Sequence, residues 1–129
     1  MAAILNHTIV WCSDKARSAA FLGDVLGLPP AQPFSHFLVH ALANGVSMDF
    51  MEKEGAIARQ HYAFLVSEDE FDQGFTLIRE RGLTYWADPA REKPGEITRH
   101  WGGRGVYFED PDGHFLELIT KPYGATEDL

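Results

Sequence analysis

An internal repeat is the feature that most constrains the fold of this chain. Three pairs of residues recur at an offset of 54 or 55: His7 with His61, Asp14 with Glu68, and Gly27 with Gly82. In each half a carboxylate, Asp49 or Glu117, also stands four residues after a glycine, at the larger offset of 68. A repeated unit of this size cannot bury its apolar face alone. The two copies must therefore pack together, either within one chain or across a dimer.

The first copy reads as a strand, a helix and further strands. Residues 4–11 form a β-branched and aromatic run, and Ser13 and Asp14 follow it as candidate helix caps. The helix pattern ends at Gly27. Residues 34–42 then predict one strand, and an Asn-Gly turn joins it to a second strand over 46–51.

The second copy repeats this order with one insertion. A strand is predicted over 61–66, a helix with a capping box of Ser67 and Glu70 follows, and a short strand lies near Tyr85. The stretch GVYFEDPDGHFLELIT, residues 105–120, predicts two strands joined by a tight turn. Residues 88–103, rich in Pro, Gly and charge, hold the insertion of 14 residues (68 minus 54) and predict a loop that covers a site.

The size and charge of the chain limit its organisation and partners. We expect a single domain over residues 1–129, with module one at about 1–54, module two at about 60–122 and a polar C-terminal tail at 123–129. A net charge of -8 argues against nucleic acid or an anionic membrane as partner. The chain shows no signal peptide or membrane-spanning run, and Cys12 is its only cysteine, so we expect a cytoplasmic protein without an internal disulfide.

Glu117 is the residue that most strongly indicates a functional site. It interrupts an apolar strand, where an unpaired buried charge costs several kcal/mol. A metal ion, an Arg, a changed pKa or a position at the strand edge could each account for it. Because strand side chains alternate between faces, Glu117 and Asp49 lie on the faces opposite the apolar residues that meet the helices, and so do His7 and His61.

These residues form a candidate metal site. A single His at the start of a strand is more often structural than a ligand, but the duplicated placement of His and carboxylate changes that weighting. We assign His7, His61 and Glu117 as a facial triad, which favours Fe(II), with Mn, Ni and Zn as alternatives. The substrate pocket is expected to include Trp11, Met51, Phe115, Trp101, His100 and His40, although His40 and the residues of the loop also admit structural or exposed roles.

The segments LNHTIVWCSD, HYAFLVSED and GVYFEDPDGHFLELIT resemble the vicinal oxygen chelate superfamily, which includes glyoxalase I, extradiol dioxygenases, fosfomycin-modifying enzymes and bleomycin-binding proteins. The resemblance implies an α+β fold of two βαβββ modules that form a partly closed mixed sheet around a metal. It places His7, His61 and Glu117 at the metal positions and Asp49 at the fourth position. The stretch GVSMDFME is similar to the ChaP-like group of aromatic-ring oxidative enzymes from polyketide biosynthesis.

Departures from the family patterns favour one activity. Asp49 is one methylene shorter than the Glu that glyoxalase resemblance implies, and the Ser-rich potassium loop of fosfomycin enzymes is replaced here by Trp-Gly-Gly-Arg over 101–104. We therefore expect a homodimeric Fe(II) dioxygenase that uses oxygen to cleave an aromatic or polycyclic diol, with Asp49 as general base or as an anchor for the groups that bind the metal. The alternatives are a glyoxalase-type isomerase, a fosfomycin-type thiol transferase and a non-catalytic antibiotic-binding resistance protein.

Overall fold

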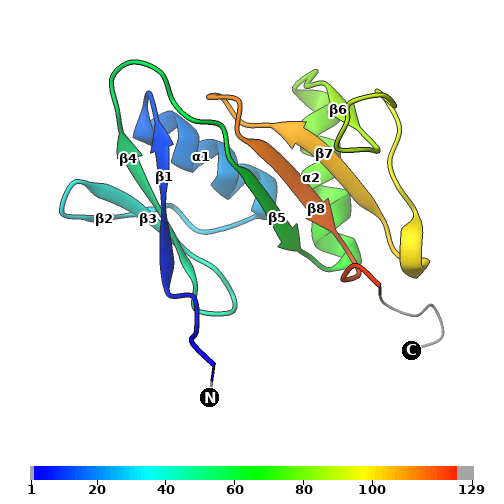
Figure 1. Ribbon diagram of the computed structural model, residues 1–129, viewed down its shortest axis with the longest axis horizontal. Helices are drawn as coiled ribbons and strands as arrows, with labels where there is room; N and C mark the ends of the chain where they lie inside the picture. The colour runs from blue at the N-terminus through cyan, green and yellow to red at the C-terminus, as the bar shows by residue number, and fades with distance from the viewer. Residues whose placement is uncertain (1, 125–129) are drawn as a thin grey trace.

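The computed structural model describes residues 2–124 as two modules with the same order of elements (Figure 1). Module one contains β1 (His7–Cys12), α1 (Lys15–Leu26), β2 (Gln32–Phe34), β3 (Phe37–Ala41) and β4 (Ser47–Glu52). Module two contains β5 (His61–Leu65), α2 (Glu68–Glu80), β6 (Tyr85–Trp86), the 3-10 turn η1 (His100–Gly102), β7 (Gly105–Glu109) and β8 (Phe115–Ile119). The predicted tail falls partly outside this range, since residues 125–129 are not among those described.

Each module contributes a four-stranded mixed sheet. The strand orders are β1-β4-β3-β2 and β5-β8-β7-β6, and the first pair in each sheet is parallel. The repeat extends to the register, because Asp49 stands opposite Ile9 and Glu117 stands opposite Ala63, two residues after the histidine in each case. The predicted α+β class with two βαβββ modules is confirmed. The two sheets are separate and are not closed into one.

Local sequence signals set the ends of the helices. The side chain of Asp14 accepts a hydrogen bond from the backbone N–H of Arg17 and begins α1, and Gly27 ends it in the left-handed conformation at φ 68°. Ser67 and Glu70 form the predicted capping box at the start of α2. Both helices are therefore specified within a few residues of their ends.

One predicted strand is wrong. Residues 34–42 were expected to form a single strand, but the chain reverses at Ser35 and His36, and β2 pairs antiparallel with β3. Ser35 adopts a positive φ of 53°, which is uncommon for a residue other than glycine. The two turn residues, Ser35 and His36, are not the Gly or Asn that two-residue hairpin turns favour, so the sequence signal for this turn is weak.

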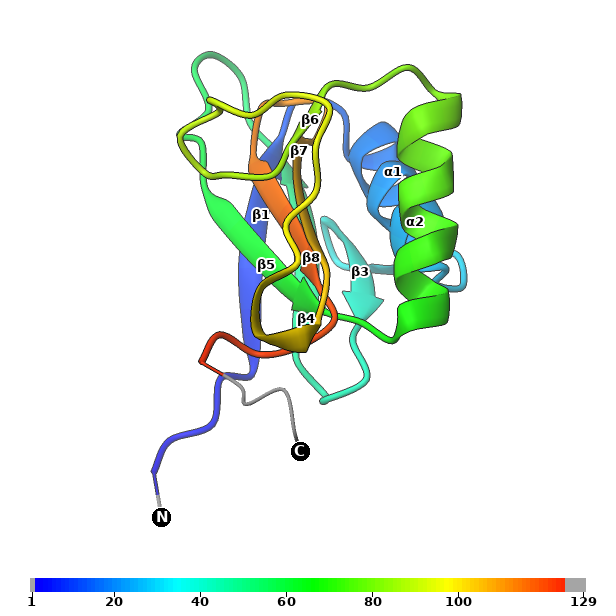
Figure 2. The same ribbon diagram turned by 90° about the vertical axis from the view of Figure 1, so that its right-hand side faces the viewer.

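Both helices lie against the same side of the two sheets, as Figure 2 shows. The core between these layers includes Val10, Phe50, Ile78 and Leu118, each at most 2% exposed. The helices approach closely at Gly74, where an added Cβ would lie 2.7 Å from the carbonyl oxygen of Val25. Neither helix has the length and apolar character to span a membrane within the described residues.

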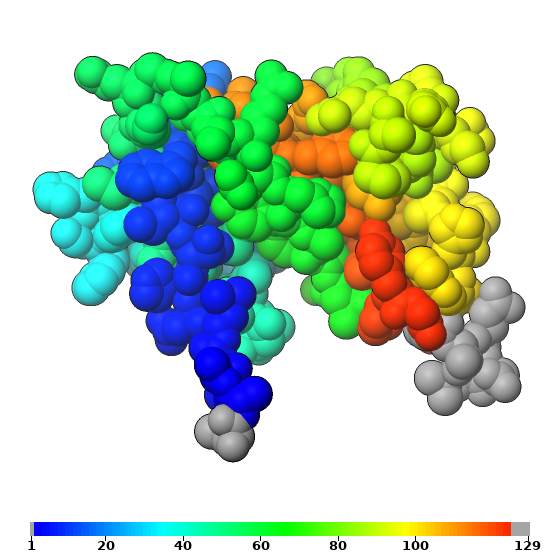
Figure 3. Space-filling view, viewed as in Figure 1, coloured from blue at the N-terminus to red at the C-terminus, as the bar shows by residue number. Residues whose placement is uncertain are grey.

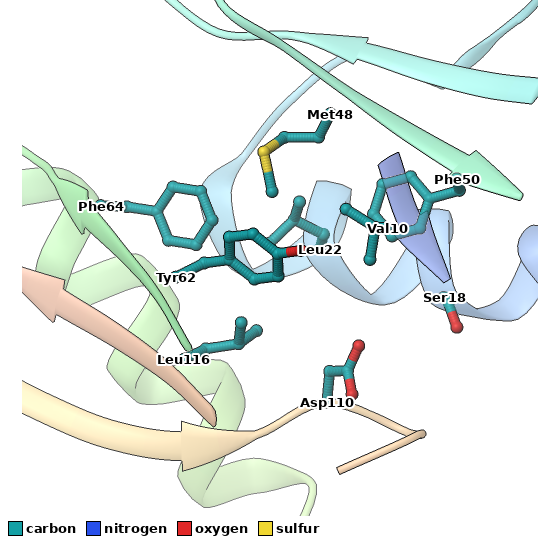
Figure 4. A pocket seen from close by; sticks show the side chains of 9 residues that line it. All are labelled: Val10, Ser18, Leu22, Met48, Phe50, Tyr62, Phe64, Asp110 and Leu116. Carbon is teal, nitrogen blue, oxygen red and sulfur yellow. The ribbon is translucent and has the colours of Figure 1, made fainter. Parts of the chain in front are cut away.

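The seam between the modules encloses a small cavity of about 10 Å³ (Figure 4). Its lining comes from both modules: Val10, Ser18, Leu22, Met48 and Phe50 from the first, and Tyr62, Phe64, Asp110 and Leu116 from the second. Such a volume holds about one water molecule. The cavity is therefore a packing feature of the core and is too small for an organic substrate.

A buried histidine also joins the modules. The backbone N–H of Gln60 donates to Nδ1 of His114, so the ring carries its proton on Nε2 and donates to the carbonyl oxygen of Trp11 at 2.8 Å. His114 is 1% exposed. His114 therefore has a structural role at the contact between the modules.

The insertion in module two connects β6 to β7. Bridges between Trp86 and Pro94 and between Thr98 and Gly105 attach this segment to the sheet. Asp88 accepts the backbone N–H groups of Glu92 and Lys93, which stabilises a tight turn within it. The expected loop is therefore present, and it is an ordered extension of the sheet edge.

Candidate metal and substrate site

The candidate site lies on the face of module two opposite the helices. His61 begins β5 and Glu117 lies in the neighbouring strand β8, and their side chains meet with Nε2 3.1 Å from Oε1. The side chain of Glu117 is 1% exposed, whereas that of His61 is 48% exposed. A buried carboxylate and an accessible imidazole therefore lie next to each other on this face.

The hydrogen bonds of His61 favour a cation between these two groups. Nδ1 lies 2.8 Å from the carbonyl oxygen of Phe115, which can only accept, so Nδ1 carries a proton. In the neutral ring Nε2 then presents a lone pair toward the Glu117 carboxylate. Two lone pairs at 3.1 Å repel unless a proton or a metal ion lies between them.

The same geometry suits a metal ion. Metal-binding histidines commonly donate the other ring N–H to a backbone carbonyl, as His61 does to Phe115. Two ligands at about 2.1 Å from one ion and about 90° apart are separated by about 3.0 Å. The observed 3.1 Å between Nε2 and Oε1 fits this spacing. His61 and Glu117 therefore form a suitable pair of donors for a divalent metal.

Two tyrosines complete the surroundings of Glu117. The hydroxyl of Tyr123 donates to the second carboxylate oxygen of Glu117 and lies 2.8 Å from the hydroxyl of Tyr107. Burial raises the pKa of both phenols, so both are protonated at neutral pH. Tyr107 stands directly opposite Glu117 in the β7–β8 ladder. Neither tyrosine was predicted from the sequence, although the Asp-Pro-Asp-Gly turn fixes the register that pairs Tyr107 with Glu117.

Aromatic rings extend this face away from the donor pair. Phe115, an expected pocket residue, stacks on Tyr107 with ring centroids 5.3 Å apart and an angle of 17°. Trp86, which the sequence analysis did not select, lies 5.9 Å from Phe115. The ring of His61 lies 5.8 Å from that of Phe115. An aromatic wall formed by Phe115, Tyr107 and Trp86 therefore begins at the candidate metal donors.

Module one presents the equivalent face with a different lining. Asp49 is 9% exposed and accepts a hydrogen bond from the hydroxyl of Ser47 at 2.9 Å. His7 is exposed at the start of β1, with Nδ1 2.8 Å from the side-chain oxygen of Asn6. Trp11 is 37% exposed and Met51 is half-buried on this side of the sheet. These four residues, His7, Trp11, Asp49 and Met51, thus share one face.

The two faces do not meet within one chain. In Figure 1, β1 runs upward, whereas β5 runs obliquely downward. His7 and His61 are the first residues of these strands. Across residues 2–124, three or more His, Cys, Asp or Glu side chains do not gather in a metal-binding group. The single chain brings His61 to Glu117 but does not bring His7 to either.

Three further candidates have distinct positions. His40 does not line the face of the donors, because its Nε2 lies 2.7 Å from the carbonyl oxygen of Ala19 on the helix side of the sheet. The β3–β4 register, which pairs His40 with Met48, explains this direction. Trp101 in η1 packs on Tyr123 at 5.1 Å, and His100 packs on Trp101 at 5.5 Å. These two residues thus approach Glu117 only through Tyr123.

Comparison with known proteins identifies the family. The model of the Glyoxalase/Bleomycin resistance protein/Dioxygenase superfamily matches residues 4–118. The chain belongs to this superfamily. Among solved members, Oxidase ChaP-H2 has a TM-score of 0.93 and 57% identity, over 97% of this chain and 98% of that chain. Oxidase ChaP-H1 has a TM-score of 0.93 and 56% identity, over 96% and 100%. The expected likeness to the ChaP-like group is confirmed.

A more distant relative in the superfamily has a different activity in its name. Metallothiol transferase FosB of Lysinibacillus sphaericus is 29% identical over 121 residues, which cover 90% of this chain and 81% of that protein. The similarity therefore spans both modules but is much lower than that to the ChaP oxidases.

Proposed function

We propose that this protein is an Fe(II)-dependent dioxygenase that cleaves the ring of an aromatic or polycyclic diol. The observation that carries the proposal is the donor pair of His61 and Glu117 at one end of a wall of aromatic rings. The 57% identity to Oxidase ChaP-H2 supports oxidative chemistry over the other activities of the superfamily. In the proposed reaction one carbon–carbon bond of the ring breaks and both atoms of oxygen enter the product, so no external reductant is consumed.

In this proposal the metal is held by His61, Glu117 and His7 of a second copy. The opposite directions of β1 and β5 support this arrangement, because a two-fold axis can bring the start of one strand to the start of the other (Figure 1). In the described residues β1 and β5 each have a partner strand on one side only. Figure 3 shows β1 (blue) and β5 (green) at the surface of one face. They also carry exposed apolar side chains, with Trp11 37% and Leu65 62% exposed. A homodimer would cover these edges and complete the site.

Fe(II) bound there would supply Lewis acidity and redox chemistry toward oxygen. The chain's own residues would position the reactants. Phe115 would contact the flat substrate, and the hydroxyl of Tyr123 would hold the carboxylate of Glu117 in its orientation. We assign Asp49 as the general base that takes a proton from a substrate hydroxyl. Its burial with a hydrogen bond from Ser47 supports this role.

Mixing two inactive variants tests the shared site. His7→Ala and His61→Ala each remove one ligand from every site of a homodimer. Equal mixing under conditions that exchange subunits makes half of the dimers mixed, and each mixed dimer regains one intact site. We expect recovery of about a quarter of wild-type activity. A site built within one chain predicts no recovery, and that result would reject the shared arrangement.

Metal and oxygen measurements test the activity. Protein purified without oxygen is expected to bind Fe(II) and to consume oxygen with 2,3-dihydroxynaphthalene as a diol probe. Asp49→Asn is expected to retain the metal and lose most turnover, because it removes the base and not a ligand. Thiol-dependent turnover without oxygen uptake would instead assign the activity named in the FosB relative. Ligand binding that survives His61→Ala and Glu117→Ala without any turnover would assign a binding protein.

A further inference from the structure

A cationic side chain stands at the far end of the aromatic wall. The guanidinium of Arg91 lies 4.0 Å from the ring centroid of Phe115 and 5.3 Å from that of Trp86. Phe115 is the strand neighbour of His61, and their rings are 5.8 Å apart. One aromatic ring therefore separates Arg91 from the candidate metal donors. A flat molecule on this wall would contact the cation and the metal site at the same time.

Arg91 is held in place by the insertion that distinguishes module two. Its backbone has a positive φ of 59°, a conformation that residues other than glycine adopt only when the surroundings favour it. The Asp88 turn surrounds it, since the carboxylate of Asp88 accepts the N–H groups of Glu92 and Lys93. Nη2 of Arg91 donates to Glu109 at 3.1 Å. The guanidinium is thus positioned before any ligand arrives.

The contacts of Arg91 differ from those of a structural arginine. Arg104 also stacks on a ring, that of Phe71 at 4.4 Å, but it pairs with two carboxylates, Glu68 and Asp72, each at 2.8 Å. Arg91 pairs with Glu109 through one nitrogen, and its side chain is 38% exposed. A guanidinium has five N–H donors, so Arg91 retains donors for a ligand. An exposed pair such as Arg91–Glu109 adds little stability by itself.

Arg91 also provides local attraction for an anion on an acidic protein. The chain has a net charge of -8, and the site itself contains the carboxylates of Glu117 and Glu109. An anionic ligand would be repelled by this charge unless a cation faced it directly. The planar fork of an arginine matches a carboxylate, and its stacked position leaves the edge of the fork free to bind.

We propose that Arg91 is a specificity-determining residue that binds an acidic group on the substrate. The ligand class is a flat aromatic molecule with a carboxylate or an ionised phenol at one end, which packs against Trp86 and the edge of Phe115 beside the guanidinium. This inference rests on the proposed function for the role of the face as a substrate site. It adds the requirement for negative charge, which the proposed dioxygenase activity does not include.

Two probes with the same ring system distinguish the contribution of charge to binding from that of shape. 3-Hydroxy-2-naphthoate carries a carboxylate, and 2,3-dihydroxynaphthalene is neutral near pH 7. Binding of each is measured by calorimetry to the metal-free protein. We expect wild type to bind the naphthoate more tightly than the diol. Arg91→Gln should lower the affinity for the naphthoate at least about tenfold and change the affinity for the diol by less than about twofold. Arg91→Lys should give an intermediate loss, because it keeps the charge without the fork.

Two further variants sharpen the test. Arg79→Gln is the matched control, since Arg79 stacks on Phe75 at 4.5 Å on α2 and should not affect either probe. Glu109→Gln removes the competing carboxylate and should tighten naphthoate binding. Three outcomes would overturn the proposal. In Arg91→Gln these are an equal loss of affinity for both probes or an unchanged affinity for the naphthoate; in wild type it is equal affinity for the acid and the diol. Because these measurements use no metal or oxygen, they stand apart from a failure of the dioxygenase activity.

Discussion

The sharpest test of the metal site is Glu117→Gln. Glutamine has nearly the same shape as glutamate and can still contact His61 and Tyr123, but it lacks the negative charge that binds a divalent ion. Glu117 is 1% exposed, so a shape change here would disturb the core, whereas this substitution preserves the volume. The difference in thermal stability between wild type and Glu117→Gln should therefore appear mainly in the presence of metal.

The expected shift in Tm follows from the binding of the metal to the folded state only. A metal at a hundred times its dissociation constant stabilises the folded state by about 2.7 kcal/mol. Unfolding entropy is about 2.1 cal/mol/K per residue, or about 270 cal/mol/K for a chain of 129 residues. The wild-type Tm should then rise by about 10 °C. A variant that binds a hundredfold more weakly gains only about 0.4 kcal/mol, which corresponds to about 1.5 °C.

Differential scanning calorimetry without oxygen, with and without Fe(II) or Mn(II), measures this shift. Glu109→Gln is the matched control, because Glu109 lies on the same face in β7 but is 37% exposed and pairs with Arg91. We expect the control to keep the full rise. A Glu117→Gln protein that keeps it too, or a wild type that gains no stability from Fe, Mn, Ni or Zn, would refute the assignment of Glu117 as a ligand.

Three further predictions concern the fold. Gly74→Ala should lower the free energy of unfolding in urea by about 1–2 kcal/mol, because its Cβ would lie 2.7 Å from the carbonyl oxygen of Val25, and an unchanged midpoint would contradict the close helix contact. Burial raises the pKa of the Cys12 thiol to about 11, so a disulfide reagent at pH 8 should label it only after unfolding. Burial also raises the pKa of Asp110, so Asp110→Asn should match wild type near pH 3 and exceed its thermal stability at pH 7; an equal difference at both pH values would contradict this.

Several features of the site could be predicted from local sequence. Side chains in a strand alternate with a period of two, so parity alone placed His61 and Glu117 on the face away from the helices. The same alternation applies to His40. The Asn-Gly turn pairs His40 with Met48, which neighbours Asp49 and so points to the opposite, helix-facing side; the register therefore indicates the direction of His40.

Other features lacked a local signal. Tyr123 follows the last strand in a segment expected to be a polar tail, yet it contacts Glu117 and Tyr107. Arg91 lies in an insertion with no periodic pattern, and its stacking on Phe115 depends on the turn around Asp88. Such contacts depend on how a loop or a chain end returns to a sheet, and short-range residue preferences do not encode that path.

The sequence by itself determined the repeat, the two modules and the residues that share a face in each, because strand periodicity, turn residues and helix caps act over a few neighbours. Only the tertiary structure decided which of these residues meet. The packing of α1 against α2 sets the modules with β1 and β5 in opposite directions, so Glu117 meets His61 and not His7. That choice depends on contacts between residues far apart in the chain, where buried apolar area, and not local pattern, determines the arrangement.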